Sequence, residues 1–103
     1  MWVIKWTPEA EEQFYNILEY WNEHNGSNTY SQKIYLEVQK AQDLLSYNPY
    51  IDQEYELNSE IKIRKHIILK NFSIIYRITD IVEILSFWDN RQNPKKLEDF
   101  FKV

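Results

Sequence analysis

The sequence predicts an α+β domain in which a hairpin of two helices packs against an antiparallel sheet. Two segments between residues 8 and 48 repeat apolar side chains at helical spacing. Three runs between residues 61 and 90 are rich in β-branched and aromatic residues. The chain has 103 residues, 44% of them hydrophobic, with one Gly and three Pro, which fits one domain with its own core. We therefore expect a single domain over residues 1–103, with an N-terminal strand, an antiparallel two-helix hairpin and three to four antiparallel strands.

The N-terminal strand and the first helix are predicted from residues 2–26. Val3 and Ile4 lie between two Trp and are typical of a strand that joins the later sheet. Thr7 is a favourable N-cap, and Pro at the next position suits the first helical turn. Gly26, the only glycine, is a natural end for this helix. Its apolar stripe consists of Ala10, Phe14, Ile17, Leu18 and Trp21.

The second helix is expected to begin after a cap at Ser27 or Asn28. It ends at Asn48, because a residue that precedes Pro avoids helical geometry. A short connection between two amphipathic helices favours an antiparallel hairpin, and the two stripes need a common surface. The stripe of this helix consists of Tyr30, Ile34, Val38, Ala41, Leu44 and Leu45.

The remaining strands follow from side-chain alternation. In residues 54–57, Tyr55 and Leu57 alternate with Glu, which is compatible with a short edge strand. Three further strands are separated by the pairs at 70–71 and 79–80. Because successive side chains point to opposite faces, we expect one apolar face and one face that carries cations. In the first of these strands the apolar set is Ile61, Ile63, Ile67 and Leu69, and the polar set is Lys62, Arg64, His66 and Lys70.

The charge is divided along the chain. The net charge is −4, but residues 1–60 carry three Lys against eleven carboxylates, a balance of −8. Residues 61–103 carry nine Lys and Arg against five carboxylates, a balance of +4. An anionic partner would therefore meet the sheet half and be repelled by the helical half. The alternative is a charged strand face that is merely solvated.

Several classes of protein are not favoured by the composition. There is no Cys and no apolar run of the ~20 residues that span a bilayer, so we expect a cytoplasmic protein that is not bound to a membrane. His24 and His66 are the only histidines, and a metal site would have to be built largely from carboxylates. We therefore expect no metal and no cofactor.

A basic set is the strongest candidate for chemistry. Such cations can bind phosphate and stabilise the charge that develops when a ribose hydroxyl attacks its own phosphodiester. His66 is a candidate general base. The neighbouring aromatic residues Tyr76, Phe87 and Trp88 are better explained as core than as base-stacking residues. The basic set consists of Lys62, Arg64, Lys65, Arg77 and Arg91.

Four segments, taken in order, resemble a known superfamily. Residues 3–10, 63–68, 72–78 and 88–94 are similar in content and spacing to the RelE/ParE toxins of bacterial type II toxin–antitoxin systems. The last two segments resemble most the ParE-like, plasmid-stabilisation branch. The resemblance implies a growth-inhibiting toxin that a cognate antitoxin neutralises in a hetero-oligomer.

The superfamily has two kinds of target. ParE-like members inhibit DNA gyrase, whereas RelE-like members cleave messenger RNA on the ribosome with a Lys and Arg cluster and a Tyr or His near the C-terminus. Here Lys62, Arg64 and Arg91 fit the nuclease pattern, but Ser73 stands where the next strand would supply Arg. The tail after Arg91 contains no Tyr and no His, and Phe101 cannot transfer a proton. The ParE-like interpretation is therefore preferred.

The resemblance also leaves two alternatives and assigns candidate residues. The chain is alternatively a ribosome-dependent endoribonuclease, or a degenerate member without toxicity. Catalytic candidates, if it is a nuclease, are Lys62, Arg64, His66, Arg77 and Arg91. Candidates for binding a partner are Lys62, Arg64, Trp88, Arg91, Phe100 and Phe101.

Overall fold

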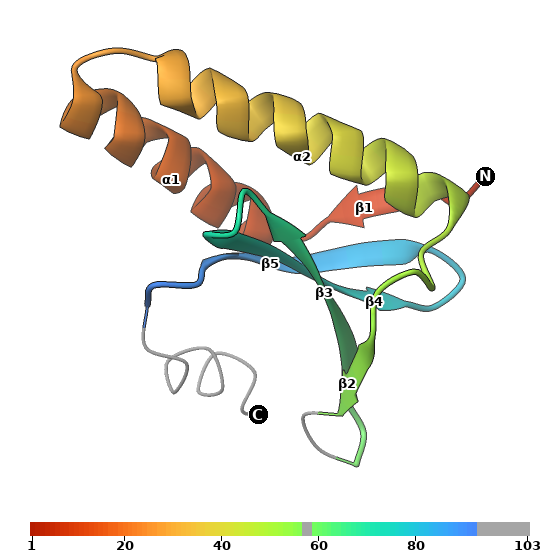
Figure 1. The fold of residues 1–103 in the computed structure, drawn as a ribbon. Helices are drawn as coiled ribbons and strands as arrows, with labels where there is room; N and C mark the ends of the chain where they lie inside the picture. The colour runs from red at the N-terminus through yellow and green to blue at the C-terminus, as the bar shows by residue number, and fades with distance from the viewer. Residues whose placement is uncertain (57–58, 93–103) are drawn as a thin grey trace.

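The computed structural model describes residues 1–56 and 59–92, and Figure 1 shows two helices lying side by side over one face of a sheet. This arrangement confirms the predicted α+β class, with a helical hairpin packed against strands. Phe100 and Phe101, two of the candidates for binding a partner, lie outside the described residues. The elements are β1 (Ile4–Trp6), α1 (Pro8–Asn25), α2 (Thr29–Tyr47), β2 (Glu54–Glu56), β3 (Lys62–Ile68), β4 (Phe72–Ile78) and β5 (Val82–Asp89).

Local capping signals set the ends of both helices. The Thr7 hydroxyl accepts a hydrogen bond from the Ala10 amide at 3.2 Å, so Thr7 is the N-cap of α1. Gly26 follows α1 with φ of 65°, a left-handed conformation that suits glycine. Asn28 precedes α2, and the Asn48 amide donates to the Leu44 carbonyl at 3.0 Å at its end. The predicted bounds of the hairpin are therefore confirmed.

The sheet has five strands within the described residues, in the order β1-β5-β4-β3-β2. The predicted edge strand is present as β2, which pairs antiparallel with β3. The sheet is mixed rather than antiparallel throughout, because β1 pairs parallel with β5, with Ile4 opposite Val82. Sequence patterns indicate that β1 exists but do not identify its neighbour or its direction, which depend on where the helical hairpin places the N-terminal segment.

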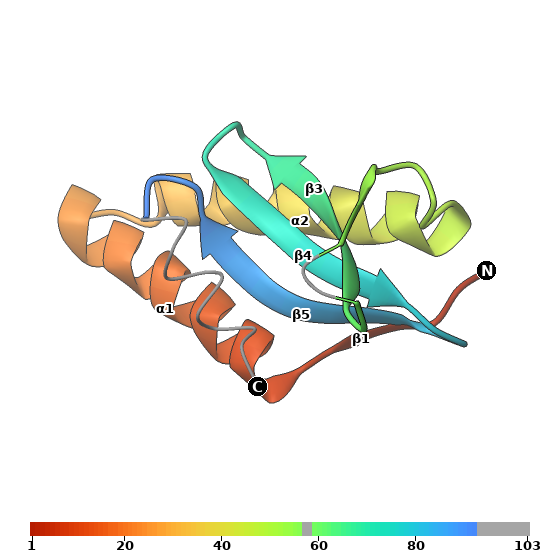
Figure 2. The ribbon, with the colours of Figure 1, turned by 90° about the horizontal axis from the view of Figure 1, so that it is seen from below.

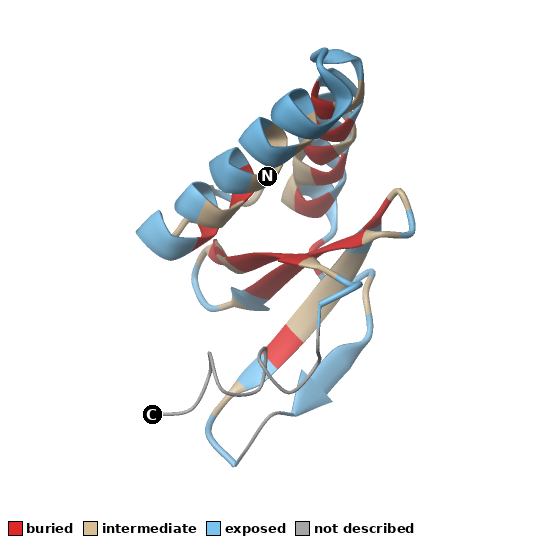
Figure 3. Cartoon of the chain, turned by 90° about the vertical axis from the view of Figure 1, so that its left-hand side faces the viewer, coloured by how far each residue is buried: buried red, intermediate tan, exposed pale blue. Residues whose placement is uncertain are grey.

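The main core lies between the helices and the sheet. Figure 3 shows buried residues on the sides of α1 and α2 that face the strands. The prediction that Leu44 belongs to the core stripe was wrong, because Leu44 is exposed whereas Leu45 is fully buried. At 100° per residue, Leu44 lies about 90° from the centre of the stripe. The buried stripe of α2 consists of Ile34, Val38, Ala41 and Leu45.

The prediction of one apolar and one cationic sheet face was also wrong. Ile68 belongs to the main core, so Arg64 and His66, which have the same parity, share the face that the helices cover. On the other face, seen from below in Figure 2, Ile63, Ile75 and Trp88 form a second buried cluster. The reason is that β3 lies next to the edge strand, and on the helix side the polar segment after α2 packs over Arg64 and His66.

Candidate functional site

The candidate cations lie at separate places on the sheet. Arg64 is opposite Tyr76 in the β3–β4 ladder, whereas Arg77 is the next residue along and therefore points to the other face. Arg91 follows β5 beyond Asp89, which is opposite Phe72 at the far end of β4. Phe72 and Arg77 are separated by roughly 17 Å along an extended strand. The structure therefore brings Arg64 and His66 together but not Arg77 or Arg91.

Arg64 is tied to the segment that follows α2. Its Nη1 donates to the Asp52 carbonyl and, at 3.4 Å, to the Tyr50 carbonyl. Its Nη2 lies 3.3 Å from the Glu54 carboxylate, and its guanidinium lies 5.3 Å from the centre of the Tyr50 ring. The side chain is only 15% exposed. Arg64 therefore directs its hydrogen-bond donors to groups within the protein.

His66 and Tyr76 converge on one carboxylate oxygen. His66 Nδ1 lies 2.8 Å from Asp52 Oδ2, a distance at which an N–H on this nitrogen donates to the carboxylate. The Tyr76 hydroxyl lies 3.0 Å from the same oxygen and 2.8 Å from the Pro49 carbonyl. Burial raises the pKa of the Tyr76 hydroxyl, and the negative charge of Asp52 raises it further. Tyr76 therefore stays protonated and acts as a donor.

We call Asp52, Arg64, His66 and Tyr76 the Asp52 cluster. Three of its side chains come from β3 and β4, and each is bonded to the segment between α2 and β2. Sequence reasoning missed Asp52, because it lies in a polar stretch without a clear pattern and is 14 residues from His66. Chemically, the cluster holds this segment on the sheet, and its donors and acceptors satisfy one another.

Lys62 and Arg77 are paired with carboxylates, whereas Lys65 contacts an aromatic ring. Lys62 Nζ lies 4.0 Å from Glu54, and Arg77 Nε lies 2.6 Å from Glu83. Lys65 instead lies over the Tyr55 ring, 5.2 Å from its centre. Within residues 1–56 and 59–92, the five catalytic candidates thus each have an acidic side chain in reach.

Arg91 forms the tightest of these pairs. Its Nη2 lies 2.6 Å from Asp89 Oδ2, and its Nε donates to Oδ1 at 2.9 Å. These hydrogen bonds hold the pKa of the Asp89 carboxyl below its ordinary value and raise the pKa of Arg91. The guanidinium also lies 5.0 Å from the centre of the Trp21 ring on α1. Trp21, Asp89 and Arg91 all line a hollow of about 530 Å³. The tertiary contact with Trp21 was not visible in the sequence.

The candidates for partner binding differ in accessibility. Lys62 and Arg91 expose 62% and 51% of their side chains. Trp88 is buried in the second cluster, as are Tyr76 and Phe87 in the main core. Ser73, where the nuclease pattern has Arg, is buried and donates to Asn90 at 2.7 Å.

Neither a metal-binding cluster nor a membrane-spanning helix occurs in the described part of the chain. No group of three or more His, Cys, Asp or Glu that could hold a metal ion occurs there. No helix there is long and apolar enough to cross a membrane.

The fold and these residues define a small α+β domain of the RelE/ParE type, with a helical hairpin on one sheet face and a cation-bearing strand beside the edge. The family model described as the ParE toxin of the type II toxin-antitoxin system parDE matches residues 4–94. The chain therefore belongs to this toxin family, and the family implies an antitoxin as its partner. A comparison with curated proteins found no match.

Proposed function

We propose that this toxin arrests growth by binding a protein target rather than by cleaving RNA. The observation that carries the proposal is the pairing of every catalytic candidate with a carboxylate. A nuclease of this kind needs unneutralised donors aimed at the developing negative charge on the phosphate. Carboxylates at those donors would instead repel an RNA backbone.

The distribution of the candidates supports the same conclusion. Arg64 and Arg77 point to opposite faces of the sheet, and Arg91 lies beyond the end of β5. Catalysis by electrostatic stabilisation requires several donors within bonding distance of one phosphate. His66, the candidate base, is already bonded to Asp52. For the target we propose DNA gyrase, the target that the ParE-like resemblance implies.

We propose that the antitoxin, in the bacterial cytoplasm, binds a surface that includes Lys62 on β3 and Arg91 beyond the end of β5. Lys62 and Arg91 are its most exposed candidate contacts among the described residues. Arg64 and Trp88 would contribute through the little surface that they expose. Phe100 and Phe101 complete the proposed set from outside the described residues.

The test is a pair of assays on one preparation of toxin released from its antitoxin. We expect inhibited supercoiling by gyrase and intact messenger RNA in a translating extract. Cleaved RNA with normal supercoiling would overturn the proposal, and Arg64→Ala and Arg91→Ala would then show whether these cations act in cleavage. If neither assay responds and cells expressing the toxin alone grow normally, the degenerate alternative is correct.

The antitoxin surface is tested separately by affinity. Lys62→Gln and Arg91→Gln should each weaken antitoxin binding, and more strongly at low salt. Lys40→Gln is the matched control, because Lys40 is an exposed, ion-paired lysine on α2 outside the proposed surface. Equal losses in all three variants would contradict the proposed location.

A further inference from the structure

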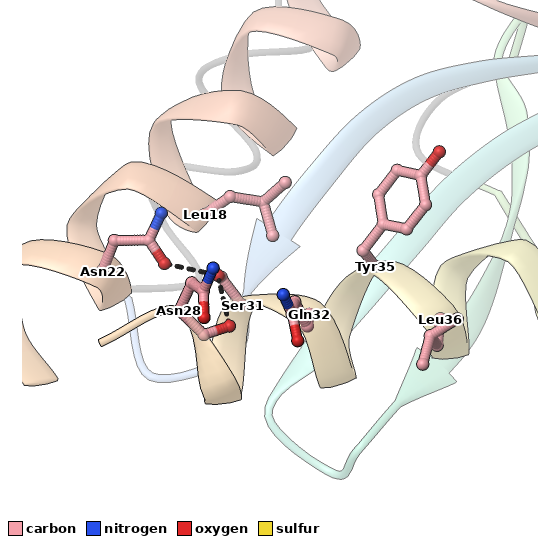
Figure 4. A pocket seen from close by; sticks show the side chains of 7 residues that line it. All are labelled: Leu18, Asn22, Asn28, Ser31, Gln32, Tyr35 and Leu36. Atoms are coloured by element: carbon pink, nitrogen blue, oxygen red, sulfur yellow. Dashed lines mark hydrogen bonds between the residues drawn. The ribbon is translucent and has the colours of Figure 1, made fainter.

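A groove runs between the two helices on their solvent side. Near the helix–helix turn it opens into a hollow of about 400 Å³ between Leu18 of α1 and Tyr35 of α2, shown in Figure 4. A second hollow of about 210 Å³ lies nearer β1, and Tyr35 lines it as well. Tyr35 lines both hollows, so the two lie next to each other along the seam between α1 and α2, which we call the groove.

Side chains at helical spacing form its two walls. On α1 the wall residues Glu11, Tyr15, Leu18 and Asn22 follow steps of three and four residues, which place them on one side of a helix. Eleven residues of α-helix span ~17 Å, or about three turns. Hydrogen bonds between elements join lining residues of both hollows, from Ser31 to Asn22 in one and from Trp6 to Gln42 in the other.

The middle of the groove is apolar and accessible. Tyr35 and Leu36 are 45% and 59% exposed, and Tyr15 opposite them is exposed as well. The Tyr35 ring is held in place by stacking on Phe14, with centroids 6.2 Å apart. Half of the remaining lining residues carry amide side chains, which can both donate and accept hydrogen bonds. A groove of this form fits an amphipathic helix whose apolar face points inward.

The charge of α1, one residue of which lines the groove, favours one kind of partner. The α1 helix contains five Glu and no Lys or Arg, and α2 contains two acidic and two basic residues. Glu11 lies in the groove itself. This field repels an acidic segment and attracts a basic one, whereas the cations proposed for the antitoxin, Lys62 on β3 and Arg91 beyond the end of β5, lie outside the groove. The groove and the antitoxin surface therefore favour partners of opposite charge.

We propose that the helical groove binds a basic amphipathic helix of about three turns that belongs to the toxin's protein target. This proposal rests on the proposed function, in which the toxin acts by binding a target. Target and antitoxin then contact different faces of the toxin.

The probe is a synthetic helical peptide of about 14 residues, with Leu on one face and Lys on the other. Two control peptides have the same length: one has Glu in place of Lys, and one has the same composition in scrambled order. In titrations followed by NMR, the basic amphipathic peptide should shift resonances of Tyr15, Leu18 and Tyr35, with an affinity that falls as salt is added. Equal binding of either control peptide, or shifts confined to other residues, would overturn the proposal.

Variants of the toxin provide a second test of the groove proposal. Tyr35→Ser and Glu11→Lys should each weaken peptide binding by about tenfold, because one removes the central aromatic contact and the other reverses the wall charge. Tyr47→Ser is the control, since Tyr47 lies on α2 outside the groove and is 75% exposed. Thermal unfolding checks that all three variants remain folded. Unchanged peptide affinity in Tyr35→Ser and Glu11→Lys would contradict the proposal that the groove binds a basic helix.

The same variants separate this inference from the proposed function. If the wild-type toxin inhibits gyrase, Tyr35→Ser should lose that inhibition and keep its affinity for the antitoxin. If the toxin inhibits gyrase and both groove variants inhibit it fully, the groove proposal is wrong and the proposed function stands. If wild-type toxin leaves gyrase unaffected, the gyrase target is wrong, and the peptide titration alone decides whether the groove binds a basic helix.

Discussion

His66 Nδ1 lies 2.8 Å from the Asp52 carboxylate, which joins the segment after α2 to the middle of β3. The same carboxylate oxygen accepts from the buried Tyr76 hydroxyl, so one acidic side chain satisfies groups from two strands. Arg64 holds the adjoining backbone through the Asp52 carbonyl. The chemistry that the sequence suggested for this strand is thus used to fix a loop.

Removal of the Asp52 carboxylate should destabilise the fold. Asp52→Ala leaves the buried Tyr76 hydroxyl and the His66 ring without this acceptor, and we expect a loss of about 1–3 kcal/mol in the free energy of unfolding. Urea unfolding measures the loss. Asp43→Ala is the control, because Asp43 is an exposed carboxylate on α2, and its loss should be below about 0.5 kcal/mol. Equal effects of the two substitutions would show that the Asp52 cluster contributes nothing specific.

The raised pKa of Tyr76 predicts a loss of stability at alkaline pH. The folded protein keeps the Tyr76 proton at a pH where the unfolded chain releases it, so this contribution is complete below the ordinary tyrosine pKa of 10.0 and declines as pH rises above it. Unfolding free energies measured between about pH 8 and 11 should fall more steeply for the wild type than for Tyr76→Phe. Parallel slopes would mean that Tyr76 titrates alike in the folded and unfolded states. The comparison uses slopes because Tyr76→Phe also lacks two hydrogen bonds.

Features set by local chemistry were predictable from the sequence. The bounds of α1 and α2 follow from Thr7, Gly26 and Asn48, each of which acts on the few residues beside it. The presence of β3, β4 and β5 follows from their β-branched residues. These features depend mainly on residues that are close together in the sequence.

Features set by tertiary contacts were not predictable. Alternation along β3 separates two sets of side chains but does not say which set lies on the helix side of the sheet, where Arg64 and His66 contact the segment after α2. Leu44 satisfies the helical spacing yet lies at the margin of the stripe. Trp21 and Arg91 are 70 positions apart, and only the packing of α1 beside the end of β5 brings them together. The partners of a candidate site, rather than its cations, were the unpredictable part.

The N-cap of α1 should be energetically important, and that of α2 should not. The Thr7 hydroxyl accepts from Ala10 and also lies 3.4 Å from the Leu85 carbonyl, whereas the Asn28 side chain makes no capping hydrogen bond. Thr7→Ala should lower the free energy of unfolding by about 1 kcal/mol, and Asn28→Ala by less than half of that. Chemical denaturation compares the two. A larger effect at Asn28 would contradict the assignment of the caps.

The Asp89–Arg91 pair predicts a change in acid titration. Because Arg91 lowers the pKa of Asp89 in the folded state, the pair's contribution to stability is present above the ordinary aspartate pKa and is lost as pH falls through the lowered value. In Arg91→Gln, NMR titration of the Asp89 carboxyl should give a higher pKa, nearer the ordinary value, and the acid-dependent loss should shrink. Arg77→Gln is the control, since Arg77 pairs with Glu83 and should leave Asp89 unchanged. An Asp89 titration that is identical in wild type and Arg91→Gln would show that the bidentate contact does not persist in solution.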